Sequence, residues 1–166
     1  MYVDYDPVVL AHARALLTSN PAGATAYIDA DLRDTSAILR QAGELLDFSQ
    51  PVAVTLLAIL HVIPDSDDPH AIVAKLLGAV PSGSYLAITH SGTDLFDAGT
   101  GDTFRGVINQ VMRQRYSPRS REEVARFFAG TDLVPPGLVA LEEWRPEPSP
   151  AEAGQSAIYG AVGRKR

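Results

Sequence analysis

The 166-residue sequence contains no cysteine. Without a thiol the chain can form no disulfide framework and no thiolate metal site, and it has no thiol nucleophile. The sequence Gly-x-Ser-x-Gly, which marks the nucleophile of many serine hydrolases, is absent as well. Hydrolysis through an activated serine or cysteine is therefore a poor interpretation of this chain.

The sequence also has no apolar segment long enough to cross a bilayer. Its longest apolar run, residues 52–63, is shorter than the roughly 20 residues that a membrane-spanning helix needs. The chain begins MYVDYD, with neither the basic stretch nor the apolar stretch of a secretion signal. We therefore expect a cytoplasmic protein without a membrane partner.

Positive charge is scarce, with 14 Lys and Arg against 20 Asp and Glu and a formal net charge of −6. A net negative chain repels phosphate backbones and anionic lipid. The two basic runs, residues 113–126 and 164–166, are interpreted as solvated surface. No nucleic-acid partner is expected.

The composition and the pattern of apolar residues indicate a folded α/β protein. Hydrophobic residues make up 46% and charged residues 20%, which is typical of a globular protein, and the length fits one domain over 1–166. Strands and helices alternate, which indicates a parallel sheet with right-handed crossovers. The pattern predicts helices at 6–19, from 34, at 69–77, 102–115 and 120–128, and strands at 24–30, 52–60, 85–89, 138–144 and 157–162.

The strand at 52–60 is a continuous apolar run with β-branched residues, so we expect it to be covered on both faces. Asp6, Asp34, Asp68 and Ser120 each stand directly before a predicted helix and are expected to cap it. Ser120 is followed three residues later by Glu123, which predicts a capping box.

Four stretches combine these elements with polar residues at strand ends. Residues 4–14 read DYDPVVLAHAR and residues 27–34 read YIDADLRD. Residues 57–65 read LAILHVIPD, and residues 76–88 carry the turn PSGS before an apolar strand. In this order the stretches resemble the Rossmann-like sheet of class I S-adenosylmethionine-dependent methyltransferases.

The closer resemblance is to an S-adenosyl methyltransferase family of GC-rich bacteria, formerly a domain of unknown function. Phrases similar to VDYDPVVLAHARALL at 3–17 and SREEVARFF at 120–128 recur in that family. The resemblance implies strands in the order 3-2-1-4-5-7-6, the seventh antiparallel, with helices on both faces. It also implies methyl transfer from S-adenosylmethionine to an unknown small-molecule acceptor, with no metal required.

By resemblance, four residues would bind the cofactor. Asp4, at the end of one strand, would accept hydrogen bonds from the ribose hydroxyls, a role that suits a carboxylate because it can accept from two adjacent hydroxyls. Asp31 would meet the adenine amino group, and the backbone amide of Leu32 would meet the ring. Leu60 would lie beside the methionine half.

Two histidines would lie near the acceptor. His61 ends the strand of the leucine-histidine motif and is the candidate catalytic residue, which could position the acceptor or take its proton. His90 ends the next strand and is the candidate substrate contact. The alternatives are a packed, hydrogen-bonded His61 and a loop histidine without function at position 90.

One acidic and histidine-rich segment could suggest a metal site. Its residues do not have the spacing of a helical histidine pair, and the segment lacks the glycine of a calcium loop. A solvated loop followed by a helix cap is the better interpretation. The segment comprises His61, Asp65, Asp67, Asp68 and His70.

The sequence departs from the family pattern at its start. Only Met1, Tyr2 and Val3 precede Asp4, where the family has a first strand and a glycine-rich loop whose amides approach the cofactor. We therefore expect a truncated domain, and we hypothesise that Met1 is an internal GTG valine codon read as a start. Such a fragment is predicted to bind the cofactor weakly or not at all.

Loss of the first strand would leave open sheet edges. The main alternative is therefore a non-catalytic remnant or interaction module of the same fold, which pairs its open edge with another chain or with a second copy of itself.

Overall fold

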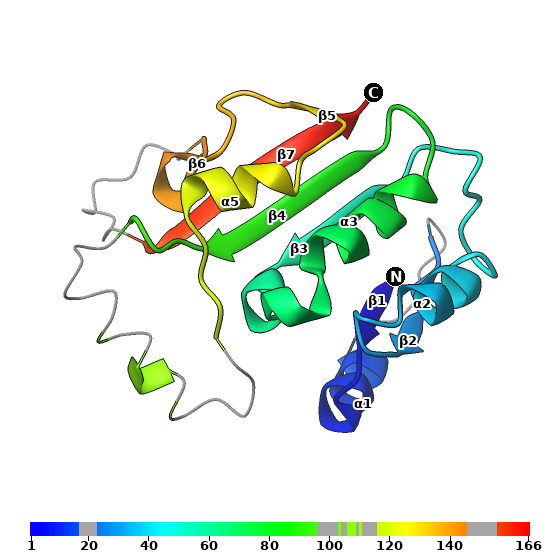
Figure 1. The fold of residues 1–166 in the computed structure, drawn as a ribbon. Helices are drawn as coiled ribbons and strands as arrows, with labels where there is room; N and C mark the ends of the chain where they lie inside the picture. Colours follow the sequence, from blue (N-terminus) through cyan, green and yellow to red (C-terminus); the bar gives the residue numbers. More distant parts are fainter. Residues whose placement is uncertain (17–22, 96–102, 104–105, 109, 111–115, 146–155) are drawn as a thin grey trace. The chain divides into compact units, whose positions relative to one another are not determined.

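The computed structural model describes residues 1–16, 23–95, 103, 106–108, 110, 116–145 and 156–166. It divides into two compact units, Met1–Gln50 and Pro51–Arg166, which are described separately (Figure 1). The predicted helix at 102–115 lies for the most part outside the described residues, as do the last residues of the predicted helix at 6–19.

The first unit is a strand-helix-strand-helix segment with two parallel strands. Asp4 on β1 is in register with Asp29 on β2. Asp6 caps α1, because its Oδ1 accepts from the amide of Val8 at 2.8 Å. Its elements are β1 (Tyr2–Asp4), α1 (Pro7–Leu16), β2 (Tyr27–Asp29) and α2 (Thr35–Ala42).

A small apolar core holds this unit together. Ile28 of β2 is buried against Ile38 and Ala42 of α2. Asp34 caps α2 as predicted, accepting from the amide of Ala37 at 3.0 Å. Partly buried residues complete the core: Met1, Ala30, Leu32, Leu46 and Phe48.

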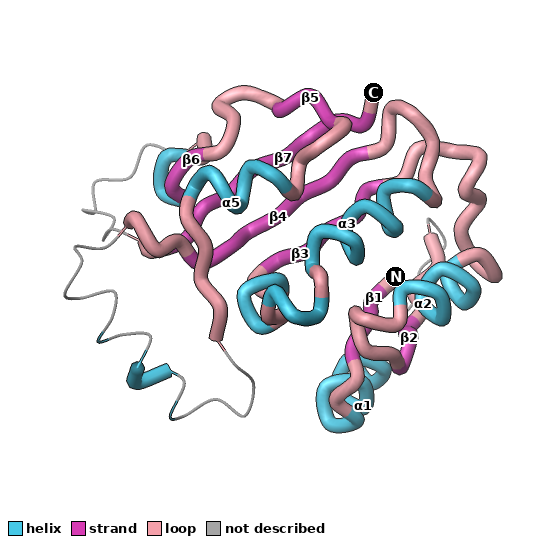
Figure 2. Tube along the Cα trace, viewed as in Figure 1, coloured by secondary structure: helices cyan, strands magenta, loops and turns pink. Residues whose placement is uncertain are grey.

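The second unit is built on a five-stranded mixed sheet in the order β3-β4-β7-β5, with β6 also paired to β7 (Figure 2). β3 and β4 are parallel, whereas β7 runs antiparallel to β4 and β5. The predicted α/β class and the antiparallel seventh strand are confirmed. The strands are β3 (Ala53–Leu57), β4 (Tyr85–Ser91), β5 (Thr131–Leu133), β6 (Val139–Ala140) and β7 (Ile158–Lys165), and the helices are α3 (Pro69–Gly78) and α5 (Arg121–Arg126).

The two faces of this sheet are covered unequally. α3 and α5 lie over the same face (Figure 2), where Leu56, Leu86 and Ile88 are buried. On β3 the alternate residue Leu57 is 58% exposed. Cover on both faces of residues 52–60 stays a prediction, because the predicted helix at 102–115 lies for the most part outside the described residues.

The strand also ends earlier than predicted. Ala58 has a φ of 54°, a left-handed conformation that is uncommon for a residue other than glycine and does not continue a strand. The chain turns there into a short 3-10 helix, Leu60–Val62. The turn brings Leu60 and His61 to the carboxyl end of β3.

Helix caps were predicted well. Asp68 caps α3 by accepting from Ala71 N at 3.0 Å, and Ser120 with Glu123 forms the predicted capping box. Two short strands near the C-terminal end were predicted less well. The strand expected at 138–144 is only Val139–Ala140, followed by a 3-10 turn, and β5 had no counterpart in the prediction. Both strands have at most three residues, which leaves little sequence pattern to recognise.

Among the described residues, β1 pairs with β2 alone and β3 with β4 alone. One edge of each strand therefore has no strand partner there, and such an edge can accept a further strand. Association of copies through an edge stays a prediction. None of the described helices is long and apolar enough to cross a membrane.

The C-terminal end of α3 is tied to the last strand. Lys165 Nζ donates to the carbonyl oxygens of Leu77 at 2.8 Å and Val80 at 2.7 Å. A positive charge at the C-terminal end of a helix is favoured by the helix dipole and satisfies carbonyls that have no partner within the helix.

We expect Lys165→Met to lower the free energy of unfolding by about 2 kcal/mol, because two carbonyls lose a charged donor while the apolar stem remains. Urea unfolding would measure this. Arg164→Met, at the exposed neighbouring position, should change stability by less than about 0.5 kcal/mol. Equal effects of the two substitutions would contradict the assignment.

Candidate functional site

In the first unit, the two candidate aspartates lie at the carboxyl ends of adjacent parallel strands. Asp4 is the last residue of β1, and Asp31 follows the end of β2 by two residues. The amide of Ala30 donates to the carbonyl of Asp4 at 3.1 Å, which extends the strand pairing to the residue before Asp31. Both side chains therefore belong to the edge at which α/β folds bind ligands.

The two carboxylates have different surroundings. Asp4 Oδ1 accepts from the amide of Asp6 at 2.8 Å. Asp31 is held by Arg33 in a bidentate pair, with Nε to Oδ1 at 2.9 Å and Nη2 to Oδ2 at 2.7 Å. This hydrogen bond lowers the pKa of Asp31 and keeps the group charged. A ligand that binds Asp31 would have to share it with Arg33.

In the second unit, polar side chains gather at the carboxyl ends of β3 and β4. The rings of His61 and His90 meet edge to face with centroids 5.7 Å apart, and Ser91 Oγ is 3.4 Å from His61 Nδ1. Leu60 is completely buried beside them. We call Leu60, His61, His90, Ser91 and Arg119 the strand-end cluster.

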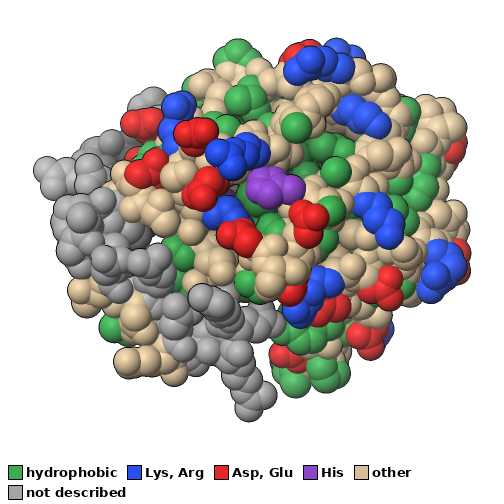
Figure 3. Space-filling model, viewed as in Figure 1, with side chains coloured by type: hydrophobic (Ala, Val, Ile, Leu, Met, Phe, Trp, Pro, Cys, Tyr) green, Lys and Arg blue, Asp and Glu red, His purple; other side chains and the backbone are tan. Residues whose placement is uncertain are grey.

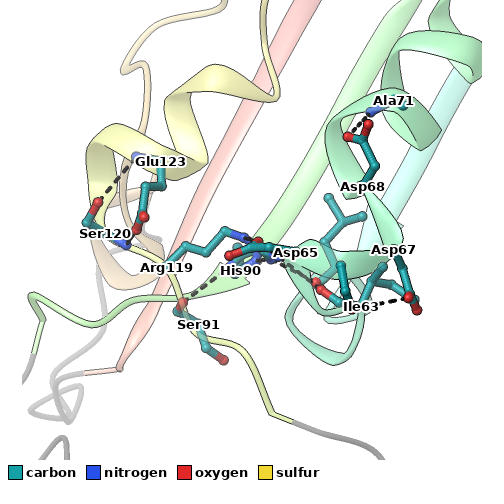
Figure 4. A network of polar contacts seen from close by, with 12 residues as sticks. Ile63, Asp65, Asp67, Asp68, Ala71, His90, Ser91, Arg119, Ser120 and Glu123 are labelled. Atoms are coloured by element: carbon teal, nitrogen blue, oxygen red, sulfur yellow. Dashed lines mark hydrogen bonds and ion pairs between the residues drawn. The ribbon is translucent and has the colours of Figure 1, made fainter.

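Arg119 connects the members of this cluster (Figure 4). Its backbone pairs with the end of β4, because its amide donates to Ser91 O at 3.1 Å. Its side chain is only 4% exposed. The guanidinium donates to Leu60 O at 3.0 Å, to Ile63 O at 2.9 Å and to Asp65 Oδ1 at 2.6 Å.

Burial and the Arg119 charge together lower the pKa values of the two histidines. Burial, followed by the Arg119 charge, lowers the pKa of His61. Burial lowers the pKa of His90 to about 4, with further lowering by Arg119 and His61. Both rings are therefore neutral at pH 7, and a neutral imidazole can accept a proton.

The two histidines differ in accessibility. His61 is half-buried, and its ring also contacts Tyr116 edge to face at 5.5 Å. His90 is fully buried. Its Nδ1 lies 2.9 Å from Ser91 O and its Nε2 lies 2.9 Å from Arg119 Nη1. Substrate contact by His90 stays a prediction, and these bonds give the ring a role inside the cluster.

Sequence reasoning missed Arg119. It falls in the basic run 113–126 that was interpreted as solvated surface, and its burial shows that interpretation to be wrong at this position. No local signal separates it from Arg121, because both stand beside the cap Ser120. The acidic segment around Asp65 is explained in part by Arg119 and by the helix cap at Asp68.

One face of the molecule carries charges of both signs. On the face seen in Figure 3, acidic and basic side chains are interspersed around a histidine. His70, at the start of α3, is half-buried and stacks on Phe127 with centroids 4.2 Å apart.

Comparison of the sequence with known protein families identifies the family of this chain. A family model described as S-adenosyl methyltransferase matches residues 1–166. The chain belongs to the S-adenosyl methyltransferase family. S-adenosylmethionine is the cofactor of this family. The predicted family and the predicted cofactor are thereby confirmed.

Two solved structures with clear sequence similarity agree. A DUF574 family protein from Streptomyces avermitilis is 38% identical, with a TM-score of 0.90 over 99% of this chain and 64% of its own. A protein from Thermobifida fusca that is described as a putative methyltransferase is 32% identical. Its TM-score is 0.85 over 99% of this chain and 62% of its own. The chain therefore spans less than two thirds of the length of these relatives.

More distant structures share the fold alone. An S-adenosylmethionine-dependent methyltransferase from Anabaena variabilis is 14% identical, with a TM-score of 0.65 over 99% of this chain and 67% of its own. The N-methyltransferase NodS from Bradyrhizobium japonicum, crystallised with S-adenosyl-L-homocysteine, is 10% identical, with a TM-score of 0.58 over 98% of this chain and 64% of its own. No curated protein matched the sequence.

The burial of His90 predicts a pH-dependent stability. The pKa of His90 is about 4 in the folded chain, whereas the pKa of a histidine in an unfolded chain is about 6.5. The stabilising effect of the neutral ring is therefore complete above about pH 6.5 and is lost as the pH falls toward about 4, with a slope approaching about 1.4 kcal/mol per pH unit.

Urea unfolding of wild type and His90→Gln over this pH range would measure the effect. The substitution keeps a hydrogen-bond acceptor but cannot titrate, so the variant should lose much of the slope. His70→Gln serves as the control, since His70 is less buried. A wild-type slope retained in full by His90→Gln would contradict the prediction.

Proposed function

We propose that this chain takes part in S-adenosylmethionine-dependent methyl transfer to a small-molecule acceptor. The observation that carries the proposal is the position of Asp4 and Asp31 at the ends of adjacent parallel strands. Two carboxylates spaced in this way suit a nucleoside, which offers two adjacent ribose hydroxyls and an amino group as donors. The proposal retains the cytoplasmic setting expected from the sequence.

The residues of the first unit fit the nucleoside part of the cofactor. Asp4 is half-buried, and its Oδ1 accepts from the local amide of Asp6. It would accept from the ribose hydroxyls. Asp31 would meet the adenine amino group while still bonded to Arg33, and the backbone of Leu32 would lie against the ring. The side chain of Leu32 packs on the apolar core, which fixes that backbone.

The candidate residues for the reaction itself belong to the second unit. Leu60 would contribute an apolar wall that excludes water. His61 is neutral and could accept the proton of an acceptor hydroxyl or amine. When bound, S-adenosylmethionine supplies a methyl group on a sulfonium, so the protein has mainly to align acceptor and methyl. His61 would take the proton of the acceptor oxygen or nitrogen as that atom receives the methyl group.

We also propose that these 166 residues alone bind the cofactor weakly. The chain spans 64% and 62% of the two similar solved proteins, and their remaining residues have no counterpart among these 166. A dissociation constant above about 100 µM would follow where part of the cofactor contacts comes from such residues.

Binding can be measured in this weak range by NMR. We expect S-adenosylhomocysteine, added to ¹⁵N-labelled chain, to shift the amide signals of Asp4, Asp31 and Leu32. Asp4→Asn should raise the dissociation constant about tenfold, because a charged acceptor for two hydroxyls is lost.

Asp29→Asn is the matched control. Asp29 is exposed and stands opposite Asp4 on the neighbouring strand, so its substitution should leave the dissociation constant within about twofold. The assignment of Asp4 would be abandoned if the two variants bound equally well. Binding at about 1 µM by the wild-type chain would refute weak binding.

A further inference from the structure

The second unit carries a buried positive charge that the proposed methyl transfer does not itself require. Arg119 is 4% exposed. A buried charge is tolerated only when it is paired and hydrogen-bonded, because its transfer out of water is otherwise very costly. The arrangement of acceptors around Arg119 therefore shows what this side chain holds in place.

The acceptors come from two separate segments. Three belong to the turn after β3, namely the carbonyls of Leu60 and Ile63 and the carboxylate of Asp65. The fourth is Nε2 of His90, at the end of β4. A planar guanidinium with five fixed donors can join such a set, whereas an ammonium group cannot reach it with the same geometry.

The contact with His90 decides which ring nitrogen carries the proton. Arg119 has only donors, so Nε2 must accept its hydrogen bond. The hydrogen of the neutral ring is then on Nδ1, where it is donated to Ser91 O at 2.9 Å. The bond to Arg119 therefore fixes both the orientation and the tautomer of His90.

The contact with the turn places His61. The carbonyls of Leu60 and Ile63 flank this residue, and its own carbonyl accepts from the amide of Ser117 at 2.7 Å. His61 is only half-buried, and among the described residues its Nε2 makes no hydrogen bond, whereas its Nδ1 faces Ser91 Oγ.

We propose that Arg119 is a positioning residue for methyl transfer, one that locks the turn at residues 60–65 and the His90 ring so that His61 presents Nε2 to a hydroxyl or amine acceptor. This inference rests on the proposed function for its role in transfer. The links from Arg119 to His61 and His90 can be tested without cofactor, so the two proposals can fail separately.

The first test uses the wild-type chain. ¹⁵N NMR of the imidazole nitrogens distinguishes the tautomers of a neutral histidine. We expect His90 to show a protonated Nδ1 and an unprotonated Nε2, without titration between about pH 5.5 and about pH 8. A protonated Nε2 on His90 would overturn the proposal, and this result does not depend on whether any variant folds.

The second test removes the guanidinium. His61 is faced by the rings of His90 and Tyr116, by the Ser91 hydroxyl and by Arg119, which is the charge that acts on it. Arg119→Met should therefore raise the pKa of His61 and leave His90 with a mixture of tautomers. Arg119→Lys keeps the charge and should restore the low pKa of His61 but not the single tautomer.

Arg126→Met is the matched control, since Arg126 is exposed and pairs with Glu122 on the surface of α5. It should leave both histidines unchanged. Unaltered His61 and His90 signals in folded Arg119→Met would overturn the inference. If S-adenosylhomocysteine fails to bind while the histidine signals respond as expected, the proposed function fails and the positioning contacts stand.

Discussion

A positive charge buried away from water must be surrounded by hydrogen-bond acceptors. In the second unit the buried charge is Arg119, and the groups around it are arranged to accept its hydrogen bonds. The turn after β3, the end of β4 and the segment before α5 each contribute to its surroundings. These three segments are far apart in the sequence and have no regular secondary structure in common. The guanidinium is therefore the feature that gives the strand-end cluster a defined geometry.

The parallel strands explain why the candidate site residues lie where they do. In each unit the chain leaves a strand at its carboxyl end, and the residues that follow are released from the sheet but held near it. Asp31 and His61 follow β2 and β3 in this way, whereas Asp4 and His90 lie in the last residues of β1 and β4. The fold supplies the edge, and local hydrogen bonds then orient each side chain.

The histidines show how burial and charge act together. Both rings are kept neutral, His90 mainly by burial and His61 by burial together with Arg119. A neutral ring that reaches the surface can receive a proton, whereas a neutral ring with both nitrogens engaged can only hold its neighbours. The two rings therefore suit different roles, proton acceptance at position 61 and support of the cluster at position 90, and the difference lies in burial and in the bond to Arg119.

The sequence alone determined the α/β class, the order of most elements, the helix caps and the family. These features depend on local patterns: apolar runs, cap residues such as Asp68 and Ser120, and short motifs at strand ends. It did not determine that β3 stops at Leu57 or that β5 exists.

Only the tertiary structure decided the role of Arg119. In the sequence it is one arginine in a basic run, and its four acceptors are contributed by residues 60–65 and 90. Whether a charge is buried depends on residues that are distant in the sequence. The residues next to position 119 therefore do not predict it. For the same reason the partners of His61 and His90 became visible only when the ends of β3 and β4 were placed side by side.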